Sequence, residues 1–113
     1  MIILEWVDTE MKYYNKLVRD RIPEIIEHKG GKCATEILSN TEYLKMLDAK
    51  LDEEAAEYHK DQNLEELADL LEVIYAITVA RGYTVSDLER LRAAKATERG
   101  AFKQKILLKE VWD

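Results

Sequence analysis

The chain has 113 residues, of which 47% are apolar and 35% charged, and its formal net charge is −6. These values are typical of one globular domain with a modest core, and the acidic excess argues against nonspecific nucleic-acid binding, which requires a basic face. No apolar run is long enough to span a membrane. The single Cys33 cannot form an internal disulfide, which favours a reducing cytoplasm.

We expect the chain to consist of a short N-terminal extension and one domain. Residues 1–12 include a second methionine, Met11, which is an alternative start, and we expect them to form an N-terminal extension. We expect residues 13–113 to form a single domain. Its first segment, 13–21, is dense in charge, and Pro23 then suits the first turn of a short helix.

Helical patterns dominate the rest and predict a mainly α fold, a helical bundle with three long helices. Ser39 is among the cap candidates for the first long helix, and Gly82 ends the second. Ser86 and Glu89 have the spacing of a capping box that opens the third. Segments 34–38 and 105–111 are β-like, so we expect a small two-stranded ribbon, which would need helices to pack on.

Two pairs of acids mark residues 50–75, which are expected to form two helices joined by a short polar turn. Glu54 and Glu57 are three residues apart on the first helix, and Glu66 and Asp69 are three apart on the second. Antiparallel packing would bring the pairs together. Four converging carboxylates repel each other unless a cation joins them, and Mg²⁺ or Mn²⁺ prefers oxygen ligands of this kind.

The helical wheel ranks the acids of the first helix. At about 100° per residue, Glu54 lies roughly 50° from the centre of the apolar stripe and Glu57 roughly 110° from it. Glu53 lies about 150° away, so we expect it to face solvent. Lys50 falls on the same flank as the two favoured acids.

The second helix is apolar almost all round from residue 64 to residue 80, which predicts burial on most sides. Glu66 and Asp69 nevertheless lie on the face continued by Val73 and Ala76. Charges on a packed face cost several kcal/mol unless they are paired or bound to metal. That cost favours a functional site at these two acids.

A purely structural role explains the same acids in another way. Asn63 is a cap candidate for the second helix, which would place Glu66 as its capping-box partner. Glutamates on the first helix would simply form a solvent-exposed face.

In the third helix, Lys95 falls on the apolar side, where it either extends toward solvent or points at the acids or a substrate phosphate. Arg99 follows one turn later.

Three segments in order resemble a known family. EEAAE followed by EELADLLEVI resembles the ExxE…ExxD signature of the all-α nucleoside triphosphate pyrophosphohydrolases, which include MazG proteins, dimeric dUTPases and phosphoribosyl-ATP pyrophosphohydrolase. YYNKLVRDRIPEIIE and KATERGAFKQKILL resemble the two ends of a small MazG-like subfamily. The likeness runs from about Tyr13 to Val111. The short connection between the acid pairs departs from many relatives and leaves the substrate open.

The resemblance implies a metal-dependent pyrophosphohydrolase that cleaves a nucleoside triphosphate or related nucleotide to a monophosphate and pyrophosphate. Mg²⁺, or Mn²⁺, would be held by the four paired acids, and Glu54 or Glu57 would accept the proton of the attacking water. The residues expected to bind substrate phosphates are Lys16, Arg19, Lys50, Lys95 and Arg99. Hydrolysis of phosphoribosyl-ATP is the alternative within the same class.

The apolar second helix predicts a homodimer or higher homo-oligomer, because one short chain cannot easily cover it, and members of the resembled superfamily form dimers or tetramers. The sequence also leaves open a non-catalytic helical oligomerisation or regulatory module. In such a module Lys50, Lys95 or Arg99 would neutralise the acids and leave no cation site.

Overall fold

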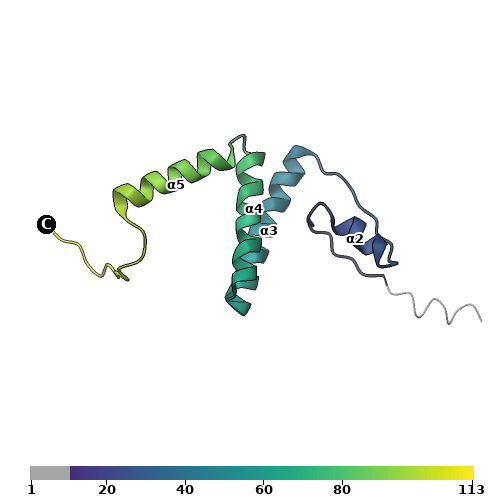
Figure 1. Cartoon of the computed structure of the whole chain (residues 1–113), viewed down its shortest axis with the longest axis horizontal. Coiled ribbons are helices and arrows are strands. Elements are labelled where there is room, and N and C mark those ends of the chain that lie inside the picture. Colours follow the sequence, from purple (N-terminus) through teal and green to yellow (C-terminus); the bar gives the residue numbers. More distant parts are fainter. Residues whose placement is uncertain (1–10) are drawn as a thin grey trace, which may run out of the picture.

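The structure is a computed structural model that describes residues 11–113. The predicted mainly α fold is confirmed: the elements are α2 (Ile22–His28), α3 (Asn40–Asp61), α4 (Leu64–Ala80) and α5 (Val85–Arg99), as Figure 1 shows. Residues 1–10 of the N-terminal extension predicted for residues 1–12 lie outside the described residues.

Side-chain caps set where the three long helices begin. The Ser39 hydroxyl accepts a hydrogen bond from the Glu42 N–H at 3.3 Å, and the Asn63 side chain accepts one from the Glu66 N–H at 2.9 Å. These bonds satisfy backbone donors that the first turn of each helix leaves without partners. Both caps were among those expected from the sequence.

The capping box of α5 was predicted at the wrong residues. Thr84, and not Ser86, is the N-cap, and its side chain and that of Asp87 exchange hydrogen bonds with each other's backbone N–H at 3.0 and 2.9 Å. Thr84 has the extended backbone of an N-cap, with φ −105° and ψ 159°, whereas Ser86 is already within the helix. The box that forms therefore begins two residues before the predicted one.

α3 and α4 form an antiparallel hairpin, and this pair is the packed centre of the described residues. The turn is made at Gln62, whose φ of 50° and ψ of 39° reverse the chain immediately before Asn63. Leu47 on α3 and Val73 on α4 are the two buried hydrophobic side chains among the described residues, at 4% and 8% exposure.

The segment that contains α2 lies on one side of the hairpin, and α5 and the C-terminal residues extend away from it on the other side (Figure 1). Among the described residues α5 packs on α4 but not on α3, and residues 11–113 extend over 80 × 31 × 25 Å. Within one chain α4 is therefore not buried on most sides, contrary to the prediction from its apolar sequence. Its exposed large side chains are Leu64, Leu67, Leu71 and Val79.

The predicted β ribbon is wrong, because residues 11–113 contain no strand. Segments 34–38 and 105–111 lie on opposite sides of the α3–α4 hairpin (Figure 1), so they cannot pair within one chain. Isolated two-stranded ribbons are at best marginally stable. Among the described helices, none has the length and apolarity needed to cross a bilayer.

Leu47→Ala tests the small core. Truncating a buried leucine typically costs about 2–5 kcal/mol of unfolding free energy. Because so few side chains are buried, we expect the variant to be already unfolded at room temperature and to show no cooperative thermal transition. The exposed neighbour substitution Lys45→Ala should change the free energy of unfolding by no more than about 0.5 kcal/mol. Equal effects of the two substitutions in thermal melts followed by circular dichroism would contradict this description of the core.

Candidate functional site

The hairpin brings the four predicted acids into two overlapping groups. Glu54 on α3 and Glu66 and Asp69 on α4 each offer a carboxylate oxygen within 4.8 Å of the others. Glu57, Asp61 and Glu66 form the second group by the same criterion. Glu66 belongs to both groups, so it lies at the centre of the cluster.

Asp61 was not predicted as part of this cluster. It lies at the end of α3, four residues after Glu57, so both side chains are on the same face of the helix. The i, i+4 spacing is therefore the signal that sequence reasoning could have used. Together, Glu54, Glu57, Asp61, Glu66 and Asp69 form the carboxylate cluster.

Three of the predicted phosphate-binding cations lie beside the acids. Lys50 Nζ lies 3.3 Å from Glu54 Oε1, one turn along the same helix. From the segment before α2, Arg19 Nη2 donates a hydrogen bond to Asp69 Oδ1 at 2.7 Å. Lys16 Nζ donates to Glu53 Oε1, also at 2.7 Å. The N-terminal segment therefore covers one flank of the hairpin.

Glu53 does not face open solvent as the helical wheel predicted. Its side chain is 33% exposed and lies between Lys16 and Lys50, whose Nζ is 3.5 Å from Glu53 Oε2. The hydrogen bond from Lys16 lowers the pKa of Glu53, and the same bond raises the pKa of Lys16. The wheel described α3 alone and could not include a segment 37 residues away that folds over this flank.

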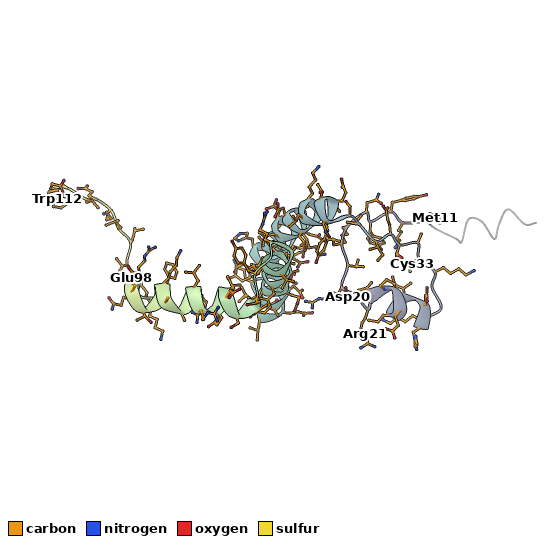
Figure 2. All side chains as sticks on the ribbon, turned by 90° about the horizontal axis from the view of Figure 1, so that it is seen from above. Met11, Asp20, Arg21, Cys33, Glu98 and Trp112 are labelled. Atoms are coloured by element: carbon orange, nitrogen blue, oxygen red, sulfur yellow. The ribbon has the colours of Figure 1, made fainter. Side chains whose placement is uncertain are left out.

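The other two predicted cations are not brought to the cluster within one chain. Lys95 and Arg99 lie on the later part of α5, which packs only on α4 and runs away from the hairpin. Figure 2 shows Glu98, next to Arg99 in sequence, at the far end of α5. The sequence placed Lys95 on the apolar side of this helix and Arg99 one turn later, and among the described residues neither forms an ion pair with the carboxylate cluster.

An open groove of about 730 Å³ adjoins the carboxylate cluster. The N-terminal segment, the loop before α3 and the facing sides of α3 and α4 line it. Its polar lining includes Arg19, Lys50, Glu54 and Asp69, and its apolar lining includes Leu17, Val18, Ile37, Leu38, Leu47 and Val73. Ligand sites commonly have this size and this combination of apolar walls with a few polar groups.

Glu66 has a perturbed pKa at the centre of the cluster. Partial removal from water raises it above the ordinary glutamate value, and repulsion from Asp61, Asp69, Glu57 and Glu54 adds to the effect. Among the described residues its carboxylate makes no hydrogen bond or ion pair, so the reciprocal capping bond of the structural interpretation is not formed. Such a carboxylate is stabilised by a proton or by another cation.

Comparisons with known proteins leave the family open. No family model matches the chain, and no solved structure matches it. A protein of Mycolicibacterium smegmatis (strain ATCC 700084 / mc(2)155), described as uncharacterized, is 57% identical over 42 residues. That alignment covers 37% of this chain and 43% of the relative. The chain therefore spans less than half the length of this relative.

Glu66→Gln should change the pH dependence of stability. Because the folded state raises the pKa of Glu66, folding favours the protonated form, and its contribution to stability is lost as pH rises from the ordinary value through the raised one. Glu66→Gln removes this loss. We therefore expect the variant to gain stability relative to the metal-free wild type as pH increases through that window.

Glu65→Gln is the matched control, because Glu65 lies in the same first turn of α4 and does not belong to the carboxylate cluster. Both substitutions remove a charge that favours the N-terminal end of the helix. Chemical denaturation in chelator across the acidic-to-neutral range gives the comparison. A stability difference between Glu66→Gln and wild type that does not vary with pH would contradict the raised pKa of Glu66.

Proposed function

We propose that this protein is a metal-dependent nucleotide pyrophosphohydrolase, which cleaves a nucleoside triphosphate or related nucleotide to a monophosphate and pyrophosphate. One observation carries the proposal: the two acid pairs of α3 and α4 converge in groups whose carboxylate oxygens lie within 4.8 Å, beside a groove that also presents Arg19 and Lys50. The resemblance of these acid pairs to the ExxE…ExxD signature supports the same function.

The donor set fits Mg²⁺ or Mn²⁺. The cluster offers only carboxylate oxygens, which are the ligands that hard divalent cations prefer. Partial removal from water and nearby like charges raise the pKa of Glu66, and such an ion would neutralise those charges. Glu54, Glu57, Glu66 and Asp69 would hold it, and its chemistry is to offset phosphate charge and to lower the pKa of a bound water.

The positions of the side chains around the groove suggest which residue accepts a proton and which bind phosphate. Glu54 lines the groove and is only 12% exposed, so we assign it, ahead of Glu57, to accept the proton of the attacking water. Arg19 and Lys50 would move from Asp69 and Glu54 to the phosphate oxygens, where Arg can form two parallel hydrogen bonds. Lys16 lies beside them on Glu53 and would add positive charge.

The apolar half of the groove suits a nucleobase and sugar. Leu17, Val18 and Ile37 line the same groove as the charged side chains, so a bound nucleotide would place its base among apolar side chains and its phosphates at the cluster. No feature of this lining selects a purine over a pyrimidine. We place the activity in the cytoplasm, where the free, exposed Cys33 remains reduced.

The ion pairs also favour a second function, that of a non-catalytic helical module. Lys50 pairs with Glu54, and Arg19 with Asp69, as expected if cations of the chain neutralise the acids permanently. The state of Glu66 weighs against this module. The pKa of its carboxyl is raised, and among the described residues no cation pairs with it. Metal binding separates the two functions.

Thermal melting with and without metal distinguishes the metal-dependent hydrolase from the non-catalytic module. Metal that binds only the folded state stabilises it by about 2.7 kcal/mol at a hundredfold excess over Kd, so we expect Mg²⁺ or Mn²⁺ to raise the melting temperature of the wild type. The increase should be absent in Asp69→Asn and retained in Glu65→Gln. Equal melting temperatures with and without both metals would favour the non-catalytic module.

Pyrophosphate release tests the reaction itself. We expect the wild type to release pyrophosphate from at least one member of a panel of nucleoside triphosphates, with phosphoribosyl-ATP included, and to require Mg²⁺ or Mn²⁺. Glu54→Gln keeps the side-chain size but removes the proton acceptor, so the rate should fall by about 10²–10⁴-fold. Glu65→Gln should retain the wild-type rate. Comparable rates in wild type and Glu54→Gln would contradict the assignment.

A further inference from the structure

The segment before α2, residues 13–21, lies along the groove and is here called the strap. α2, which follows the strap, packs on none of the other described helices. Residues 31–39, which connect α2 to α3, contain no helix or strand. The part of the chain that contains α2 lies on one side of the hairpin (Figure 1). Apart from the covalent connection, the contacts of the strap itself therefore attach α2 to the hairpin.

Two charged side chains join the strap to the two helices that carry the acids. Lys16 donates a hydrogen bond to Glu53 of α3, and Arg19 donates one to Asp69 of α4, each at 2.7 Å. The four side chains are 33–56% exposed, and exposed ion pairs contribute little to stability because water and salt compete with them. The attachment is therefore specific but weak, as a reversible contact requires.

The strap also forms part of the wall of the groove. Leu17 and Val18 lie between the two attachment points and line the groove, as does Arg19. Leu17 is half-buried, whereas Val18 is 46% exposed. The position of the strap therefore determines how far the groove is open on this side.

Asp69 is the residue at which the strap meets the carboxylate cluster. It offers a carboxylate oxygen to the group that it forms with Glu54 and Glu66, and the same carboxylate accepts the hydrogen bond from Arg19. A cation held by this group would lie close to the Arg19 guanidinium, and like charges at such short range repel each other. Pairing of Asp69 with Arg19 and binding of a cation by Asp69 therefore oppose each other.

We propose that the strap is a gate controlled by the carboxylate cluster. Pairing of Arg19 with Asp69 keeps the gate closed, and release of Asp69 to a divalent cation opens it by freeing the strap from α4. Arg19 closes the gate again when it binds a phosphate group beside that cation. The inference rests on the proposed function, because it assigns Asp69 to the metal, and it adds an order of binding in which the cation precedes the nucleotide.

Limited digestion with trypsin, which cleaves after lysine and arginine, tests the gate without any assay of activity. Arg19 is paired in the closed strap, so cleavage after it should be slow in the metal-free wild type. Saturating Mn²⁺ should accelerate this cleavage by about fivefold or more, which is the range of typical coupling between sites. Mn²⁺ with inorganic triphosphate should slow it again. Cleavage after the exposed Lys105 should not change and reports on the protease itself.

Asp69→Asn distinguishes the gate from a general effect of metal on the fold. The substitution keeps the size of the side chain but removes the carboxylate that pairs with Arg19. Cleavage after Arg19 should therefore be fast without metal, and Mn²⁺ should not accelerate it further. Glu65→Gln removes a charge from the same helix outside the carboxylate cluster and should behave like the wild type.

Arg19→Gln tests the same coupling from the side of the metal. Because coupling between two sites is reciprocal, loss of the Arg19 pair should tighten Mn²⁺ binding, measured by calorimetry, by about fivefold or more. Removing a positive charge also favours a cation, so Lys16→Gln is the matched control. Lys16 belongs to the same strap but pairs with Glu53, which is outside the carboxylate cluster, and its substitution should tighten binding less.

The outcomes separate the gate from the proposed function. Mn²⁺ binding that leaves cleavage after Arg19 unchanged, or equal Mn²⁺ affinities of Arg19→Gln and Lys16→Gln, would overturn the gate and leave the metal site standing. Opening by Mn²⁺ without renewed protection by triphosphate would overturn the closing step. Absence of Mn²⁺ binding would overturn the proposed function, and the gate with it.

Discussion

Mutual repulsion among the carboxylates of α3 and α4 is the constraint on which the rest of this structure depends. A tight turn at Gln62 and Asn63 forces the acid pairs of the two helices together. Arg19 and Lys50 offset part of that repulsion, and the N-terminal segment is held over the hairpin by the contacts that Lys16 and Arg19 make. Glu66 retains an unfavourable charge, which is the feature that a divalent cation would relieve.

The small core connects the fold to assembly. A hairpin that buries only Leu47 and Val73 among the described residues obtains little stability from its own core. The exposed large apolar side chains of α4, which are Leu64, Leu67, Leu71 and Val79, would be covered in the homo-oligomer expected from the sequence.

Local patterns predicted the helices well and the long-range contacts poorly. The i, i+3 acids and the caps at Ser39 and Asn63 concern neighbouring residues, so the sequence contained the information needed. Glu53 was misplaced because its partner Lys16 comes from a distant segment. The ribbon failed because its two segments lie on opposite sides of the hairpin (Figure 1), and the apolar sequence of α4 indicated burial that a single chain does not provide.

The most direct test of the proposed metal site is to locate Mn²⁺ by its anomalous scattering in crystals grown with a non-hydrolysable nucleotide. We predict a peak bound by carboxylate oxygens of Glu54, Glu66 and Asp69, with Arg19 moved from Asp69 to a phosphate oxygen. A crystal with nucleotide bound elsewhere, no peak at the cluster and Arg19 still paired with Asp69 would contradict both the metal site and the proposed function.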